Sequence, residues 1–255
     1  MKLNKLSARY AIFGGPVMLE SQDLYTSDTV RNHPLGTLAF GDHGKMFRYA
    51  YVGGSALVAG NTLQEAAIDT TMTNMVVPTA AKAGDLYFSV TNGTATITSA
   101  QFTDGTIGVY TAGTVAVGDE YVIQAVTGTF TTGGALKVWT ERPLRYAVTT
   151  SATLNMRTSP WGGVIQSTGT TASGMCAGVA VWALPLNAYG WVQSHGECTV
   201  LADATSLGVG SDLALSATVA GAAGLYAVGT SRQRIGLVRQ AIATAKGVSA
   251  FLQID

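Results

Sequence analysis

Apolar and polar positions along most of the chain alternate with the period of two that is typical of half-buried β-strands. Residues 37–40 and 46–52 flank the predicted turn 42–44, and Phe47, Tyr49 and Tyr51 share one face of the second strand. Turn-forming residues separate later apolar runs at roughly the 8–12-residue spacing of sandwiches and barrels. The later strands are expected at 86–90, 95–98, 106–110, 121–126, 135–139, 147–150, 178–184, 190–194, 198–201, 213–216, 225–228, 235–242 and 248–254.

A short pattern recurs before four strands: a small or apolar residue, Gly, and then a polar residue. Its copies are Ala59-Gly60-Asn61, Ala83-Gly84-Asp85, Val117-Gly118-Asp119 and Val209-Gly210-Ser211. Glycine permits a positive φ, and the polar residue can bond back to its own backbone, so the pattern predicts tight turns. This structural role explains these glycines without a phosphate-binding loop. Residues 194–197, Ser-His-Gly-Glu, predict a further turn.

Residues 232–245 fit two structures. Ile235, Val238 and Ile242 would share one face of a helix. Gly236 and the content of Ile, Val and Thr favour a strand, followed by a turn at 244–247 and a closing strand. We prefer the hairpin.

These patterns predict an all-β protein of antiparallel sandwich or barrel domains with an extended N-terminal arm. Residues 1–34 are richer in charge than later stretches and show no sustained alternation. We interpret them as an arm that orders on a neighbouring molecule, although a disordered terminus or an edge strand fits equally well. The rest divides into a first β-rich domain at 35–150 and a second at 151–255, which can form one compact unit with 35–60.

The chain is poor in charge. Charged residues make up 12% of it, with 15 basic and 15 acidic side chains, against the usual roughly 25%. This balance argues against partners that need a basic surface, namely nucleic acid and anionic membranes. No apolar stretch approaches the roughly 20 residues of a membrane span, and a signal peptide is not expected. A neutral, charge-poor surface favours association, so we expect a homo-oligomer.

The residues indicate no catalytic or metal site. His33, His43 and His195 have no partner at metal-ligand spacing, and no G-x-S-x-G motif occurs. No cofactor-binding motif is present, so we expect a protein that is not an enzyme, with no cofactor and no metal. Cys176 and Cys198 lie in apolar runs and fit either two buried thiols in a reducing cytoplasm or one disulfide.

The candidate partner-binding residues are aromatic and basic side chains outside the predicted core. Arg9, Tyr10, Phe13 and Tyr25 belong to the arm, and Trp161 lies on a turn between Pro160 and two glycines. Tryptophan is enriched at interface hot spots, although a ring folded over its own loop fits Trp161 equally well. The tryptophans are also candidates for stacking on sugars, although two of them lie in apolar strands and fit core or interface positions better; they are Trp139 and Trp161, and in the apolar strands Trp182 and Trp191.

Four stretches in order carry a family resemblance: 34–37 through 47–49 to 54–60, 102–105 with 118–121, 143–144 through 160–164, and 189–193 through 196–198. Together they resemble tailed-bacteriophage virion proteins that are encoded beside the major capsid protein and described as head decoration or cement-like proteins. The resemblance spans about 35–255 and leaves the arm uncovered. Each stretch alone is turn-and-strand sequence, so the specificity lies in their order.

The resemblance implies a structural virion protein on the capsid exterior, made in the host cytoplasm, that binds the major capsid protein and stabilises the shell. The family offers no catalytic residues to carry over. The alternative is an adhesive or carbohydrate-binding head-fibre or tail-associated protein, which predicts an exposed aromatic platform. A major capsid protein is disfavoured because no long helical pattern occurs.

Overall fold

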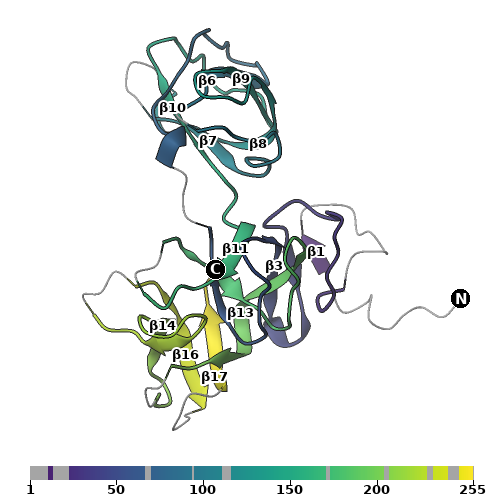
Figure 1. Ribbon diagram of the computed structural model, residues 1–255, viewed down its shortest axis with the longest axis vertical. Coiled ribbons are helices and arrows are strands. Elements are labelled where there is room, and N and C mark those ends of the chain that lie inside the picture. Colours follow the sequence, from purple (N-terminus) through teal and green to yellow (C-terminus); the bar gives the residue numbers. More distant parts are fainter. Residues whose placement is uncertain are drawn as a thin grey trace, which may run out of the picture. The chain divides into compact units, whose positions relative to one another are not determined.

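The computed structural model describes residues 11–13, 23–66, 70–93, 95–110, 116–170, 173–203, 207–228, 232–240 and 247–254, with the backbone alone at 11–13 and 70. Nearly all of its regular structure is β, which confirms the predicted fold class. The chain forms two compact units, the first made of Met1–Ala67 and Pro160–Asp255 and the second of Ile68–Ser159 (Figure 1).

The first unit contains one eleven-stranded sheet and the short 3₁₀ turn η1, Asp42–Gly44. Its strands are β1 Ala11–Phe13, β2 Leu38–Phe40, β3 Met46–Val52, β4 Thr62–Gln64, β11 Gly162–Gln166, β12 Cys176–Val179, β13 Tyr189–Leu201, β14 Asp212–Leu215, β15 Ala223–Leu225, β16 Arg234–Gln240 and β17 Gly247–Gln253. The predicted hairpin around residues 42–44 is confirmed as the antiparallel pair β2–β3.

Half of this sheet closes on itself as a first barrel of β3, β11, β4, β12 and β13. The ring closes because β13 pairs with β3 as well as with β12. All of its pairings are antiparallel except β3–β11. Its interior holds small and aliphatic side chains: Ala50, Val52, Leu57, Leu63, Val164, Ala177, Ala180, Leu184 and Val192. Closure satisfies the strand edges that an open sheet would leave unpaired.

The other half forms a second barrel of β13, β17, β16, β14 and β15. A parallel bridge between Ala202 and Ala223 joins β15 to the chain just after β13, and the Asp203 N–H donates to the Ala223 carbonyl at 2.9 Å. Ile235, Val238 and Leu252 are among its buried side chains. Residues 234–240 are therefore a strand rather than a helix, while the predicted turn at 244–247 lies largely outside the described residues.

Strand β13 belongs to both barrels and corrects one prediction. The expected turn at 194–197 is wrong, because these residues continue a single thirteen-residue strand. The strand accommodates the polar residues 194–197 with a bulge near Ser194. The Gln193 side-chain amide donates hydrogen bonds to the carbonyls of His195 and Glu197 at 2.9 and 3.0 Å. These bonds hold the backbone at the bulge, where Gly196 has a φ of 89°.

The unit boundaries differ from the predicted 35–150 and 151–255. Residues 46–66 supply β3 and β4 to the same sheet as β11–β13, so they belong with the C-terminal half of the chain. The second unit is a continuous run that begins after β4 and ends before β11. The stated alternative, in which residues 35–60 form one compact unit with the C-terminal domain, agrees with this arrangement, because pairing between strands distant in sequence sets the boundaries.

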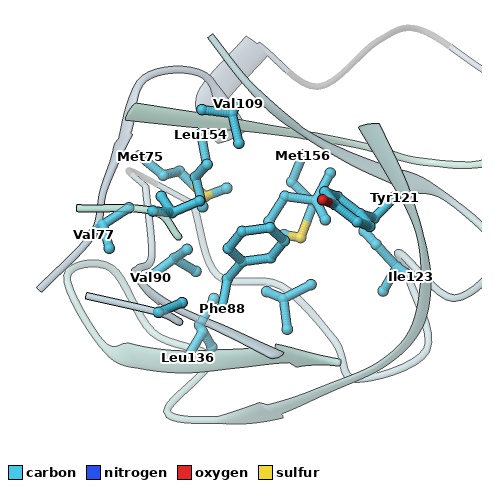
Figure 2. Packing of buried hydrophobic residues seen from close by; sticks show 14 of the residues in the cluster. Met75, Val77, Phe88, Val90, Val109, Tyr121, Ile123, Leu136, Leu154 and Met156 are labelled. Carbon is cyan, nitrogen blue, oxygen red and sulfur yellow. The ribbon is translucent and has the colours of Figure 1, made fainter. Parts of the chain in front are cut away.

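The second unit is a six-stranded antiparallel sheet in the order β5-β10-β7-β8-β9-β6. Its elements are η2 Thr70–Met72, β5 Met75–Val76, β6 Tyr87–Thr91, β7 Thr106–Val109, β8 Glu120–Gly128, β9 Ala135–Thr140 and β10 Thr153–Arg157. The sheet curves around a core in which Phe88 lies among Val90 of its own strand, Leu136 of β9 and Met156 of β10 (Figure 2).

Two predicted strands in this unit are wrong, and the strands β5 and β10 were not predicted. Residues 95–98 form no strand; Ile97 is buried and donates one backbone bond to Phe130. Within 147–150 only Val148 pairs, through a bridge to Ala81. The strand follows at Thr153–Arg157, where Leu154 and Met156 point inward.

The four recurring glycine turns are confirmed. Their glycines have φ values of 84°, 94°, 87° and 79° at Gly60, Gly84, Gly118 and Gly210. Each glycine N–H donates to a distant carbonyl, and the next residue closes an i to i+3 turn. Asn187, with a φ of 60°, occupies the equivalent place before β13 and donates to the Val52 carbonyl. We call these rigid turns β-corners.

We predict that Phe88→Ala destabilises the second unit by about 3–5 kcal/mol, because a fully buried ring is replaced by a cavity. Urea unfolding measures the loss, and hydrogen exchange resolved by segment assigns it to 68–159. Tyr146→Ala is the control, since Tyr146 is exposed and its loss leaves the core intact. Equal stability of the Phe88→Ala and control variants would contradict the packing described.

Candidate interaction surfaces

Part of the predicted arm lies on the protein's own first barrel. Leu24 is buried, and Asp28 and Tyr189 exchange backbone hydrogen bonds of 3.0 and 2.7 Å. The backbone of β1, Ala11–Phe13, pairs antiparallel with β2. Residues 23–34 therefore form part of the surface of the first unit. The described part of the predicted arm does not extend away from this unit. Arg9, Tyr10 and the side chain of Phe13 lie outside the described residues.

An aromatic cluster beneath this segment explains why it stays there. Tyr49 and Trp191, from the paired strands β3 and β13, are fully buried with ring centroids 5.1 Å apart. The His33 ring packs 5.0 Å from Tyr49 and 5.4 Å from Trp191, and the Asn32 N–H donates to the Tyr49 hydroxyl at 3.1 Å. Burial lowers the pKa of His33, which favours the neutral imidazole in this apolar setting.

Tyr25 is the arm residue that remains accessible. Its side chain is 46% exposed, and its ring lies edge-on to Phe47 at 6.3 Å. Burial of the remainder raises the pKa of its hydroxyl. A tyrosine held by one ring contact and open on the other side suits a protein contact, because its ring is already ordered.

Trp161 is partly buried. Its ring lies against Gly36, where a Cβ atom would come within 2.5 Å, and the Arg48 guanidinium lies 5.1 Å from the ring centroid. It also packs on the core of the first barrel. Arg48 in turn donates to the Gly36 carbonyl at 3.0 Å. The ring is thus held by residues distant in sequence, and its role in partner contact stays a prediction.

The outer face of β6 and β9 carries an aromatic pair that only strand register brings together. Tyr87 and Trp139 are direct cross-strand partners with ring centroids 5.0 Å apart. The Lys137 ammonium lies 5.1 Å from the Tyr87 ring centroid, and the Trp139 indole N–H donates to the Thr127 hydroxyl at 3.2 Å. We call these four residues the Tyr87–Trp139 platform. Both rings are half-buried, so part of each faces solvent.

A second exposed aromatic of this unit lies on other strands. Tyr110 follows β7, and its ring lies over Gly108, whose missing side chain leaves room for it. The Arg157 guanidinium stacks on the ring and donates a hydrogen bond to its hydroxyl. The ring is thus partly covered by a cation of the protein itself.

The titratable residues are dispersed. His43 is exposed in η1, and His195 on β13 lies edge-on to Phe251 at 5.3 Å. In the part of the chain that the structure describes, no three His, Cys, Asp or Glu residues are grouped as metal ligands. No helix in that part has the length and apolar character needed to span a bilayer.

Both cysteines are free and buried in the core of the second barrel, which decides between the two alternatives in favour of free thiols. Burial raises the pKa of Cys176 and of Cys198 to about 12. The reactive form of a cysteine is the thiolate, so neither has the activation of a nucleophile at neutral pH.

No protein-family model, curated protein or solved structure matches this chain.

We predict that the two thiols lower the protein's stability as the pH rises from 9 towards 12. In that window an unfolded cysteine ionises at its ordinary value of 9.0, whereas the folded thiols keep their protons until about 12. The unfolded state then binds fewer protons, so the unfolding free energy falls with pH.

Urea unfolding at about pH 8 and about pH 10, on either side of that ordinary value, measures this effect. The Cys176→Ala/Cys198→Ala variant removes both thiols and is expected to lose less stability over the interval than the wild type. The same loss in both proteins would show that the thiols are not shielded from solvent in the folded state.

Proposed function

We propose that the protein is a structural virion subunit, a decoration or cement protein that binds the outside of a tailed-phage head and stabilises the shell. Its partner is the major capsid protein, and the subunit also associates with copies of itself. The family resemblance of residues 35–255 motivates this proposal.

One observation carries the proposal: large apolar side chains are exposed on rigid turns of a surface with few charges. Val58, Val117, Leu186 and Val209 are all exposed at β-corners, one of them in the second unit. Backbone bonds to distant strands hold each corner. Such a surface loses little conformational entropy on contact, and its scarcity of charge keeps the desolvation cost low. Repeated by symmetry, modest contacts of this kind add up through avidity.

The test is co-sedimentation of the purified protein with matched phage heads that lack it, followed by cryo-EM of the particles. We expect saturable binding and density that follows the icosahedral lattice. Binding at a tail or portal instead, or no sedimentation with heads, would overturn the proposal.

Tyr25→Ala tests the predicted contact at the arm within the same assay. If Tyr25 is a hot spot, its truncation costs at least ~2 kcal/mol and weakens head binding more than tenfold. Tyr146→Ala, an exposed tyrosine of the other unit, is the control. A substitution is preferable to deleting the arm, because deletion would uncover Phe47 and Trp191 beneath residues 24–33.

The Tyr87–Trp139 platform favours one second candidate, the carbohydrate-binding or adhesive role. Aromatic faces beside hydroxyl groups and an ammonium group offer both stacking and hydrogen-bond partners for a sugar ring. The arrangement lies on regular strands, so it is rigid.

For that candidate we predict that the isolated protein binds glycans on an array and that Trp139→Ala weakens the binding about tenfold, or ~1.4 kcal/mol. Tyr110→Ala is the matched control, because Tyr110 is an exposed aromatic of the same unit on different strands. Absence of glycan binding by the wild type, or equal loss in both variants, would eliminate this candidate.

A further inference from the structure

Two β-corners of the first barrel are joined to each other. Leu57 and Leu184 exchange backbone hydrogen bonds of 2.8 and 3.1 Å, and both side chains are buried in the barrel. Directly after these two residues the chain turns outward on each side. Val58, which follows Leu57, is 56% exposed, and Pro185 and Leu186, which follow Leu184, are also exposed, Leu186 at 45%. We call residues 53–60 and 181–188 together the paired-corner surface.

The second unit repeats this backbone arrangement with different surface chemistry. There Ala81 and Val148 exchange backbone bonds of 2.9 Å in both directions, and each is buried. The positions equivalent to Val58, Pro185 and Leu186 are occupied by Lys82, Thr149 and Thr150, all exposed.

The second unit shows that a joined pair of corners does not require apolar side chains on its outer side. A joined pair of corners forms equally well with charged and hydroxylated side chains outside, as in the second unit. The apolar side chains of the paired-corner surface are therefore not needed to build the corners. An exposed apolar surface without a folding role is the usual mark of a contact site.

The surface is also uncharged. Neither 53–60 (Gly-Gly-Ser-Ala-Leu-Val-Ala-Gly) nor 181–188 (Val-Trp-Ala-Leu-Pro-Leu-Asn-Ala) contains an acidic or basic residue. A partner with a charged face would have to desolvate its charges here without compensation, which is costly. The fitting occupant is therefore itself apolar and uncharged at the contact.

We propose that the paired-corner surface is where a second copy of this chain binds. A copy presents the same uncharged apolar surface, and two copies carry no net charge to repel one another, because each has 15 basic and 15 acidic residues. An interface of two identical patches is the commonest way in which proteins form dimers.

The backbone is already ordered for this contact. Besides the Leu57–Leu184 bridge, the Gly60 N–H donates to the Ala180 carbonyl at 2.7 Å and the Asn187 N–H to the Val52 carbonyl at 3.2 Å. Burial of Val58 and Leu186 would therefore yield its hydrophobic gain with little loss of backbone freedom.

Sedimentation-velocity centrifugation over a concentration series tests the proposal with the full chain and without any phage head. We expect the wild type to show a concentration-dependent dimer and Val58→Asp/Leu186→Asp to raise the dissociation constant at least tenfold, because each copy then carries charges into the contact. Val228→Asp is the control, since Val228 is 94% exposed in the first unit and lies in none of the β-corners. It is expected to leave the dissociation constant unchanged.

A second variant tests the proposal in case Val58→Asp/Leu186→Asp does not fold. Val58→Thr/Leu186→Thr imitates the polar corners of the second unit and keeps the surface uncharged; it is expected to weaken the dimer in the same direction. A wild type that is monomeric at every concentration would overturn the proposal, as would a folded aspartate variant with an unchanged dissociation constant. Failure to bind heads leaves these outcomes unaffected, so this inference and the proposed capsid role fail separately.

Discussion

The first unit depends on strand β13, which must satisfy two barrels at once. Its first half pairs with β3, and its second half pairs with β17. Residues 190–194 are buried on both faces, because Val192 enters the first barrel while Trp191 packs beneath the N-terminal segment. Further along, burial alternates, with Cys198 and Val200 inward and Glu197 and Thr199 exposed. One strand thus carries two patterns of side chains, and the bulge near Ser194 lies between them.

The closure of the sheets also determines which groups the surface presents. Closed sheets leave few unpaired edges, so the exposed chemistry of the molecule is concentrated in its turns and on the outer faces of strands. The corners hold apolar side chains in fixed positions, and the Tyr87–Trp139 platform holds two rings by register alone. In both places rigidity comes from backbone hydrogen bonding rather than from ion pairs. A protein with this surface can be specific in shape while being nearly neutral in charge.

The sequence predicts much of this fold because period-two patterning reports burial directly. It identifies β3, β8, β9 and β17, and the glycine corners follow from local turn chemistry. The pattern for β10 is present as well, because Leu154 and Met156 alternate with polar residues, but this strand is not among the expected ones. The continuity of β13 was not predictable in this way, because the Gln193 side chain supplies bonds that a local reading of Ser-His-Gly-Glu assigns to a turn.

The candidate surfaces are harder to predict for a related reason. Tyr87 and Trp139 become neighbours through the register of β6 against β9, and the corners that carry Val58 and Leu186 are joined by a bridge between residues 57 and 184. Each residue alone looks ordinary in the sequence. Tyr25, by contrast, was singled out by its position in the N-terminal segment and is exposed, although the segment around it packs on its own barrel.

The order of the two units along the chain has a consequence for synthesis. Strands β4 and β11 are antiparallel neighbours, with Gln64 opposite Ile165, yet the whole second unit is inserted between them. A ribosome therefore completes the inserted unit while β3 and β4 still lack the partners that close their barrel. The inserted unit has its own core and sheet, so it can fold before β11–β13 emerge. The first barrel is begun early and closed late.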